Sequence, residues 1–423
     1  MQFSVGKESG NDEMIYLNSR GATLRGMIGK RLGFSAYVSE NQERGPSYFK
    51  ELTDSLRAVH GVGFYKPFKI DKGYDYFDAR GYITFNAAKF IDFQLGYDKN
   101  FIGNGYRSLF LSDWGNSNLF VKINTRIWKL NYQNLFMELT PQFGRRSGDI
   151  LLPRKYAAMH HLSMNVTKWL NVGLFEGVVF GRKDRFDFQY LNPIIFYRHV
   201  EGTVGSPDNA IAGLDFKANI AHRVQVYGQL LADEFKIGEI RKGTGWWANK
   251  FGYQLGAKYV DAFGIKNLDL QGEINRVRPY TYAHRDSVAD YSHYNQPLAH
   301  PLGANFNEII GIVNYQPIPR LYIHGRLLFY QKGYDSTGFN AGGNIFRNYN
   351  TRTGDYGYDV ADGRKKTVVN GLLQLSYEIK QNVFFDVALQ QRNYKIANEQ
   401  GNTGSTLITA SFRMNMFKRQ YDY

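Results

Sequence analysis

Apolar and polar side chains alternate along most of this chain in segments of about ten residues, and this period limits the fold more strictly than any other feature. The stretch from Thr367 to Lys380 is an example, because its apolar residues share one face of an extended strand and its polar residues share the other. The first face carries Val369, Leu373, Leu375, Tyr377 and Ile379, and the second carries Asn370, Gln374, Ser376 and Glu378. The pattern predicts β-strands whose two faces meet different surroundings.

The stretch 405–417 alternates in the same way and carries a charge. Its apolar residues are Ile408, Ala410, Phe412, Met414 and Met416, and they alternate with Thr409, Ser411, Arg413 and Asn415. An arginine within an apolar row is expected where its side chain points into a wet lumen and its neighbours point into lipid. The chain has no apolar run of the roughly 18 residues that a membrane helix needs, so we expect it to cross a membrane with strands that close into a barrel.

The connections between these strands are short at one end and long at the other. Short turns are expected at 87–89, 128–129, 167–168, 221–223, 316–319 and 380–381, and long polar loops at 42–73, 99–117, 141–158, 234–247, 280–304 and 334–366. Short periplasmic turns and long extracellular loops are typical of outer-membrane barrels. The sequence therefore predicts an all-β fold, a transmembrane antiparallel β-barrel in the outer membrane of a Gram-negative bacterium.

The number of strands follows from the same pattern. Eight strands are expected between Ala22 and Gly181, eight more between Ala210 and Tyr394, and a last one at 405–417. Both ends of the barrel should be periplasmic, which requires an even number, and the segment Met14–Asn18 is expected to supply the missing first strand. We thus predict about 18 strands in a single domain that spans residues 1–423.

Composition and charge agree with this class. Aromatic residues make up 16% of the chain, with 31 Tyr and 31 Phe, and there are 44 Gly and no Cys. Aromatic girdles and glycines on tilted strands are features of such barrels. No signal peptide opens the sequence, which indicates a mature or trimmed chain. The net charge of +14 fits anionic lipid or an acidic polymer, while the lack of a zinc spacing, P-loop or RNP motif argues against nucleic acid.

One apolar stretch does not fit the strand pattern. The residues 190–197 would break the even count as a lone strand, so they are either one of two short strands or part of a loop. We expect the loop, with the region 182–208 folded over or into the lumen. In that interpretation Asn192, Pro193, Arg198 and His199 belong to a lumen plug. A short helix is also expected at 48–60, within the first long loop.

The segment 96–113 is the most distinctive one. Gly103 and Gly105 permit a tight backbone path, and the charged residues Asp98, Lys99, Arg107 and Asp113 are expected to form an ion-pair network. One interpretation is structural bracing of the barrel mouth. The other is a carbohydrate site, in which Tyr106 or Trp114 stacks on a sugar ring while Arg107 holds an acidic group.

Further loop residues have side chains suited to sugar binding. The pair Trp246-Trp247 fits either an interface girdle or a sugar platform, and the proline-containing segment 295–305 indicates an ordered loop. Aromatic rings stack on sugars, and basic groups form charge-assisted hydrogen bonds with acidic ones. The candidate polysaccharide contacts are Tyr106, Arg107, Trp114, Trp246, Trp247, Arg276, Arg278 and Tyr280.

No motif indicates catalysis, a metal or a cofactor. His160 and His161 are adjacent in a predicted strand and point to opposite faces, so they are not expected to chelate one ion. Neither H-E-x-x-H nor G-x-S-x-G occurs. We therefore expect no enzymatic activity, although a Ser-His pair assembled in space is an alternative that the sequence leaves open.

Three segments carry a family resemblance: 98–113 (DKNFIGNGYRSLFLSD), 191–198 (LNPIIFYR) and 299–305 (AHPLGAN). They resemble the capsule-assembly Wzi family, and more closely its Bacteroidetes branch, which includes gliding-motility proteins called RemB. The resemblance covers most of the chain, from about residue 20 onward. It implies an outer-membrane barrel and a lectin-like retention of capsular polysaccharide without any reaction. It does not supply sugar-contacting residues position by position.

The sequence leaves three hypotheses open. The first is a non-catalytic barrel whose loops bind or anchor an acidic polysaccharide, with membrane lipid and lipopolysaccharide around it. The second is an accessory barrel of a gliding-motility or protein-secretion machine, which binds other outer-membrane or secretion proteins. The third is a diffusion porin, against which the apolar stretch 190–197 argues because it has to be buried.

Overall fold

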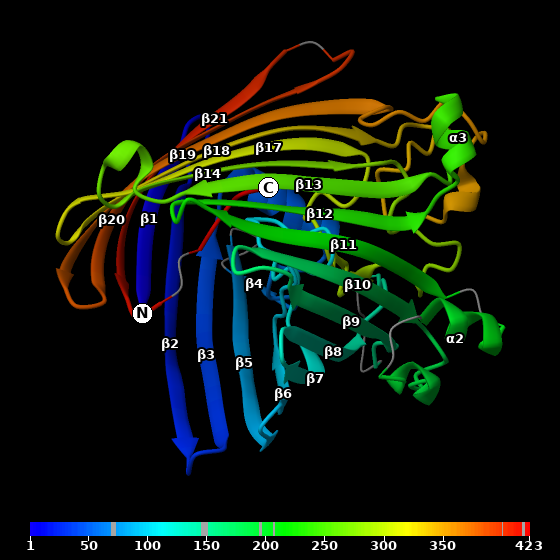
Figure 1. The fold of residues 1–423 in the computed structure, drawn as a ribbon. Coiled ribbons are helices and arrows are strands. Elements are labelled where there is room, and N and C mark those ends of the chain that lie inside the picture. Colours follow the sequence, from blue (N-terminus) through cyan, green and yellow to red (C-terminus); the bar gives the residue numbers. More distant parts are fainter. Residues whose placement is uncertain (69–72, 145–150, 194–196, 206–207, 400, 417–418) are drawn as a thin grey trace.

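In the computed structural model, nineteen strands form one sheet that closes on itself (Figure 1). The structure describes residues 1–423 except 69–72, 145–150, 194–196, 206–207, 400 and 417–418. One short strand, β4 (Lys66–Phe68), pairs with β5 alone, and the other eighteen close an antiparallel ring in which β1 pairs with both β2 and β21. The predicted barrel is confirmed.

The ring strands follow one another in sequence order around the barrel. They are β1 (Gln2–Glu8), β2 (Met14–Ile28), β3 (Leu32–Arg44), β5 (Gly73–Ala88), β6 (Ile91–Asp98), β7 (Asn118–Ile127), β8 (Leu130–Leu139), β9 (Lys155–Asn165), β10 (Leu170–Phe180), β11 (Asn209–Ile220), β12 (Val224–Glu234), β13 (Lys250–Tyr259), β14 (Leu268–Val277), β17 (Phe306–Ile318), β18 (Leu321–Tyr334), β19 (Arg364–Lys380), β20 (Val383–Ile396) and β21 (Thr403–Met414).

The predicted first strand was wrong. Met14–Asn18 is the start of β2, which continues through Gly21 to Ile28, and the additional strand is β1. Gly21 is no turn residue: a Cβ there would lie 2.3 Å from the backbone oxygen of Val38 on β3, so glycine permits a close approach of two strands. With β1 counted, the ring again has an even number of strands.

The two faces of the sheet differ as the alternation predicts. Outward residues are apolar and form rows around the barrel: Leu373 pairs with Leu389, and Leu389 with Ile408, each 46–57% exposed. Inward residues are polar and buried, as Asn370, Gln374 and Ser376 are on β19. Arg413 points inward and pairs with Asp386 at 3.1 Å. Exposed apolar rows are stable only against lipid.

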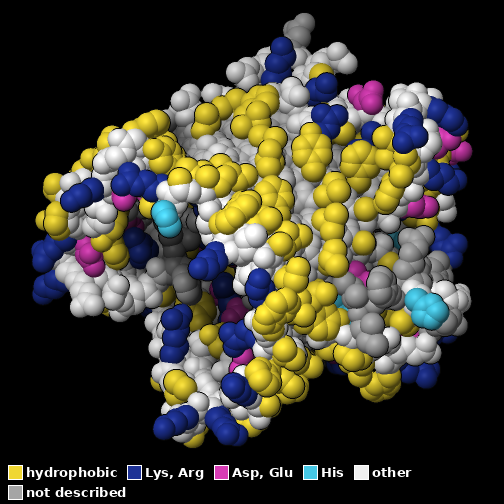
Figure 2. Space-filling model, in the orientation of Figure 1, with side chains coloured by type: hydrophobic (Ala, Val, Ile, Leu, Met, Phe, Trp, Pro, Cys, Tyr) yellow, Lys and Arg dark blue, Asp and Glu magenta, His cyan; other side chains and the backbone are white. Residues whose placement is uncertain are grey.

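Figure 2 shows hydrophobic side chains over the outer wall of the barrel, with Lys and Arg gathered toward its two ends. A closed barrel with an apolar outer belt is how outer-membrane proteins of Gram-negative bacteria are built, and it places this chain in that membrane. None of the helices among the described residues is long and apolar enough to span a membrane.

Turns and loops lie at opposite ends of the barrel. Connections such as 29–31, 89–90, 128–129 and 381–382 are short, while 45–72, 99–117, 278–305 and 335–363 are long. The N-terminal amino group donates to the backbone oxygen of Met414 at 2.8 Å, so the start of β1 and the end of β21 meet at the short-turn, periplasmic end. The helix expected in the first long loop is present as α1 (Ser47–Leu56).

Loops 99–117 and 278–305 fold into the lumen and build an apolar core there. Phe110 stacks on the inward ring of Phe175 on β10, with centroids 4.5 Å apart. From the other loop, Tyr282 and Tyr291 donate their hydroxyls to the backbone oxygens of Leu109 and Phe110 at 2.7 and 2.6 Å. Each of these side chains is almost fully buried. The extracellular half of the lumen is therefore packed with loop residues.

The loop 181–208 corrects the predicted lumen plug. It contains the short helices η1 (Phe188–Leu191) and α2 (Tyr197–Val204). Tyr190 and Tyr197 pack with Val178 and Phe180, which belong to the outward face of β10, since the alternate residue Phe175 is inward. Figure 1 shows α2 outside the ring of strands, beside the loop ends of β9 and β10.

The residues assigned to that plug accordingly lie elsewhere. Asn192, Pro193 and His199 are exposed, and the side chain of Arg198 lies outside the described residues. Tyr190 and Tyr197, the two ends of the apolar stretch, are buried against the outer wall, whereas Leu191 between them is 43% exposed and residues 194–196 lie outside the described part of the chain. A membrane protein has an apolar exterior as well as an apolar core, so the sequence alone did not distinguish the two destinations.

The segment 419–423 instead enters the lumen. After β21 ends at the periplasmic end, the chain turns back, and Figure 1 shows its last residue inside the ring. The hydroxyl of Tyr421 donates to Glu43 on β3 at 2.5 Å, and its backbone oxygen accepts from Gln390 on β20 at 3.0 Å. This segment therefore bridges β3 and β20, which stand four positions apart around the ring.

Candidate functional site

Aromatic and basic side chains converge where three extracellular loops meet. We call this group the mouth cluster, and it consists of Trp246, Trp247, Arg278, Tyr280, Tyr349, Arg352 and Tyr358. The loops are 235–249, which begins with α3 (Ile237–Lys242), then 278–305 and 335–363. Each loop follows the extracellular end of a strand, so the barrel wall holds their bases in place.

The cluster has a buried floor and a partly exposed rim. Tyr280 and Tyr358 form the floor, with ring centroids 5.0 Å apart, and are 1–2% exposed. Burial raises the pKa of Tyr280, so its phenol stays protonated and donates to the backbone oxygen of Asn340 at 2.6 Å. Above this floor, the rings of Trp247 and Tyr349 pack with their centroids 5.0 Å apart. Trp246 and Trp247 are only half-buried.

Cations surround the rim. The guanidinium of Arg352 lies 3.9 Å from the ring centre of Trp247, and the ammonium of Lys236 lies 4.9 Å from that of Trp246. Arg278 ties the loops together by donating to the backbone oxygens of Asn249 at 2.7 Å and Tyr358 at 3.1 Å. Aromatic faces beside guanidinium groups can stack on a sugar ring and pair with its carboxylate.

Tyr106 and Arg107 lie in a second group, inside the lumen. Their backbone N–H groups donate to the two carboxylate oxygens of Glu273 on β14, at 2.6 and 3.1 Å. Gly105 permits this approach, because a Cβ there would lie 2.4 Å from one Glu273 oxygen and 2.9 Å from the backbone oxygen of Arg107. The loop 99–117 is thereby fixed to the wall.

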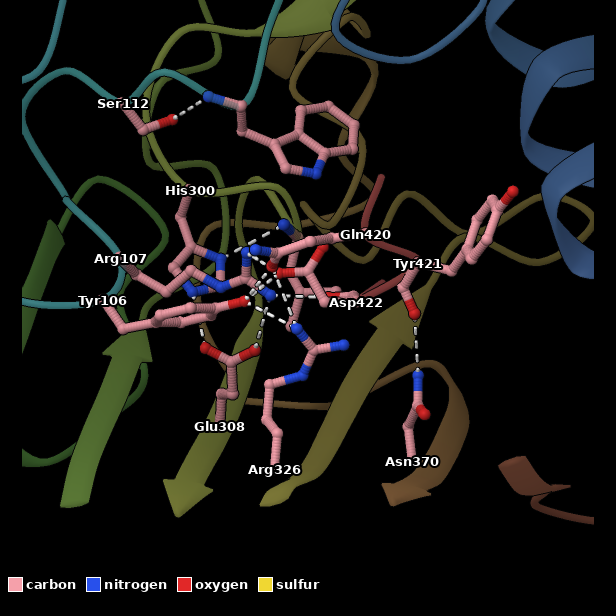
Figure 3. A network of polar contacts seen from close by, with 12 residues as sticks. Tyr106, Arg107, Ser112, His300, Glu308, Arg326, Asn370, Gln420, Tyr421 and Asp422 are labelled. Atoms are coloured by element: carbon pink, nitrogen blue, oxygen red, sulfur yellow. Dashed lines mark hydrogen bonds and ion pairs between the residues drawn. The ribbon is translucent and has the colours of Figure 1, made fainter. Parts of the chain in front are cut away.

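The side chains of this group bind the segment 419–423 (Figure 3). Arg107 donates to a carboxylate oxygen of Asp422 at 3.0 Å and to its backbone oxygen at 2.5 Å. Tyr106 donates its hydroxyl to Asp422 at 2.5 Å and accepts from Arg326 on β18 at 3.0 Å. Burial alone would raise the pKa of Asp422, but the charges of Arg107 and Arg326 lower it well below its usual range.

Trp114 belongs to the same lumenal group. It is 8% exposed and packs against His60 and Tyr423, with ring centroids 4.6 and 6.2 Å away. Burial lowers the pKa of His60 well below its ordinary value, and the nearby charges of Arg419 and Lys99 act in the same direction. Trp114 therefore packs within the protein and leaves no face open at the mouth.

A polar cavity of about 580 Å³ lies beside the segment 419–423. Its walls include Ser19, Asn41 and Asp78 from the inward faces of β2, β3 and β5, and Lys99 from the loop. Burial lowers the pKa of Lys99 to about 7. The predicted network of Asp98, Lys99, Arg107 and Asp113 does not form, since these side chains make no ion pair with one another within the described residues.

The eight predicted polysaccharide contacts thus divide into three places. Trp246, Trp247, Arg278 and Tyr280 meet in the mouth cluster, whereas Tyr106, Arg107 and Trp114 are enclosed in the lumen. Arg276 is exposed on the outward face of β14, beside the lipid-facing Ile274. The prediction missed Tyr349, Arg352 and Tyr358, although the aromatic and basic composition of loop 335–363 was a signal for them.

Comparison with known proteins gives neighbours of the fold. The chain is similar to Wzi of Escherichia coli, which is described as an outer membrane protein involved in group 1 capsule assembly and as a carbohydrate-binding β-barrel. The TM-score is 0.58 and the sequence identity is 12%, over 98% of this chain and 84% of Wzi. It is also similar to OccK8 (OprE) and OprD of Pseudomonas aeruginosa. OccK8 has a TM-score of 0.51 and 9% identity, over 97% of this chain and 95% of its own. OprD has a TM-score of 0.50 and 10% identity, over 97% and 92%.

No family model matches the sequence, and no curated protein does. At such low identities the likeness establishes the fold alone. It supports the resemblance to Wzi at that level, but not the Bacteroidetes gliding-motility branch. Among the described residues, no group of three or more His, Asp or Glu side chains is placed to hold a metal ion.

Proposed function

We propose that this protein is a non-catalytic outer-membrane barrel that binds an acidic polysaccharide at its extracellular mouth. The observation that carries the proposal is the mouth cluster, in which Trp246, Trp247 and Tyr349 are half-buried and stand beside Arg352 and Lys236. Four of the residues identified from sequence meet there, although they come from two separate loops. Their floor is rigid, because Tyr280 and Arg278 are hydrogen-bonded to backbone of neighbouring loops.

The chemistry of the cluster fits a uronic-acid polymer. A sugar ring presents C–H groups that pack on an indole face, and Trp246 and Trp247 are half-exposed indoles at 60° to each other, with Arg352 lying over the Trp247 ring. A guanidinium recognises a carboxylate through paired hydrogen bonds, which Arg352 can supply by exchanging its exposed partner Asp355. The overall charge of +14 favours the approach of a polyanion.

Two further observations support binding over transport. The extracellular half of the lumen is packed with loop residues such as Phe110, Tyr282 and Tyr291. The similar barrel Wzi is described as carbohydrate-binding. A diffusion channel is the first alternative, and a protein-binding accessory barrel is the second.

Binding and conductance measured on one preparation test the proposal. The detergent-purified protein is titrated with alginate, an acidic uronate polymer, and with neutral dextran, and is then inserted into planar bilayers. We expect saturable alginate binding, no dextran binding and no steady conductance. Trp247→Ala with Arg352→Ala should weaken alginate binding at least about tenfold, because it removes one stacking face and one charge-assisted pair.

The matched control is Trp128→Ala, which removes an 81% exposed tryptophan at the opposite, periplasmic end. It should leave alginate binding unchanged. Steady conductance without glycan binding would establish the porin alternative instead. A stoichiometric protein that co-purifies, again without glycan binding, would establish the accessory barrel.

A further inference from the structure

The segment 181–189 forms an open groove of about 700 Å³ on the outside of the barrel. It follows directly on Phe180, the last residue of β10, so the groove lies at the extracellular end of the lipid-facing wall. Its lining combines three cations and two aromatic rings, Arg182, Lys183, Arg185, Phe186 and Phe188, with one carboxylate, Asp187, which lies 3.5 Å from Arg182. A groove of this composition in this place needs a ligand that is apolar at one end and anionic at the other.

The groove is built on a fixed base. Arg182 is held by a bidentate pair with Asp208, at 2.8 and 2.6 Å, and Tyr190 donates its hydroxyl to the same carboxylate at 2.6 Å. Phe186 packs edge-on against Phe180 and Tyr156, with centroids 5.4 Å away in both cases. The backbone of the loop is therefore tied to the outward face of β9 and β10.

Two cations of the groove are available to a ligand. Lys183 and Arg185 are exposed, and within the part of the chain that the structure describes their side chains have no ion-pair or hydrogen-bond partner. Phe188 is 77% exposed on the same segment. An isolated phenyl ring in water is unfavourable, but beside a membrane it inserts among acyl chains.

The height of the groove matches the edge of the lipid. Leu174 lies six positions before Phe180 on β10, on the same outward face, and is 44% exposed toward the acyl chains. Six residues of a strand extend about 20 Å, which takes the chain from the interior of the apolar layer to its surface. The cations then stand at the level of the lipid headgroups, where the outer leaflet of this membrane carries phosphate.

We propose that this groove binds lipopolysaccharide, with the lipid phosphates on Lys183 and Arg185 and the acyl chains against Phe186 and Phe188. Cations at a membrane surface attract anionic headgroups. The aliphatic parts of Lys and Arg side chains can pack on an apolar surface while their charged ends extend to the headgroups. The groove is separate from the mouth cluster, so lipid binding here does not depend on the proposed glycan binding. It fixes one side of the barrel in the outer leaflet.

The test uses the purified full chain and defined lipopolysaccharide, with bound lipid counted by native mass spectrometry. Lys183→Gln with Arg185→Gln should weaken binding about thirtyfold, since two cations at a membrane surface are removed. Phe188→Ser should weaken it as well, without a change in charge. The control, Lys129→Gln with Arg223→Gln, removes two basic residues from the periplasmic turns and should have no effect.

Each other outcome overturns the proposal. These are unchanged affinity in both groove variants, equal loss in the periplasmic control, and a groove occupied by a co-purifying protein in place of lipid. Heat-modifiable migration in gels confirms that each variant has closed its barrel. The substituted side chains are exposed, so the fold should persist, and Phe188→Ser provides a second measurement if the charge variant does not insert.

Discussion

Arg107 and Asp422 form a buried ion pair across 315 residues of sequence, with Nη1 3.0 Å from the carboxylate of Asp422. Arg107 comes from a loop that folds down from the extracellular end, and Asp422 from a segment that turns back from the periplasmic end. Their side chains are 6% and 7% exposed, so water screens the pair little. The two ends of the lumen are thus joined near its centre.

Asp422→Asn should destabilise the barrel by about 2–4 kcal/mol, because it leaves the buried Arg107 guanidinium with only the more distant carboxylate of Glu308, 3.8 Å away. The free energy of unfolding, measured by guanidinium titration in lipid vesicles, checks this. Asp355→Asn is the matched control: it removes one partner of the Arg352–Asp355 pair, in which Asp355 is 56% exposed, and should cost less than about 1 kcal/mol. Equal costs for the two variants would contradict the prediction.

Lys99→Met should stabilise the protein below pH 7 and flatten its pH dependence above that. The pKa of Lys99 is about 7 in the folded chain, against an ordinary value of 10.5. Between those values the unfolded chain binds more protons, so the free energy of unfolding of the native sequence rises as pH increases from 7 to 10.5. Denaturation midpoints measured between pH 6 and 10 test this, and Lys129→Met in an exposed turn should keep the native slope.

His293 should make the lumenal loops sensitive to acid. It lies in β15 (Ser292–His293), which pairs with β16 (Gln296–Pro297) in the loop 278–305. Its Nδ1 accepts from the backbone N–H of Thr140 and its Nε2 lies 3.0 Å from the backbone oxygen of Ser117, an arrangement that requires the neutral ring. Burial accordingly lowers its pKa from 6.5 to about 4.

Because the unfolded histidine takes up a proton below about pH 6.5 and the folded one does not until about pH 4, stability is lost as pH falls through that window. His293→Gln keeps a donor and an acceptor but does not titrate. It should reduce the loss of protection in hydrogen exchange of loop 278–305 between pH 6.5 and 4. An identical acid response in the variant would show that other groups control it.

Leu389→Arg tests which face of the sheet meets lipid. Leu389 is outward and 46% exposed, and a charge there should destabilise the barrel by about 2–4 kcal/mol near the middle of the membrane. Leu151→Arg places the same charge on an 86% exposed residue of an extracellular loop and should cost almost nothing. Vesicle unfolding measures both, and a loss for Leu389→Arg no larger than that for Leu151→Arg would contradict the assignment of the Leu389 face to lipid.

The barrel was predictable because each strand faces the same two environments and therefore repeats the same sequence pattern. Lipid outside and a polar lumen inside impose a period of two, so Leu375 and Gln374 already show their destinations in the sequence. The position of β1 was harder to predict. The prediction ended one strand at Asn18 and began the next near Ala22, whereas in the structure Gly21 lies within β2 and allows its close approach to β3.

The site was predictable in part, for a related reason. Trp246, Trp247 and Tyr280 were identified by residue type, and the barrel brought them together by placing their loops at one end. Tyr106, Arg107 and Trp114 were equally suitable by type, but their partner is the segment 419–423. A contact between residues so far apart leaves no local pattern in the sequence. The sequence around Tyr190 and Tyr197 likewise does not show whether they pack in the lumen or on the outer wall.

Ring closure gives the segment 419–423 one more property. The pairing of β1 with β21 joins the two ends of the chain, so it has the largest loop to close of any strand pair and should form last. Arg419 and Tyr421 bind Glu43 inside the closed barrel. These residues therefore become inaccessible to solvent only once the ring of strands is complete. Protection of Arg419 from trypsin therefore marks the moment at which assembly ends, and a chain cut there is one whose barrel is still open.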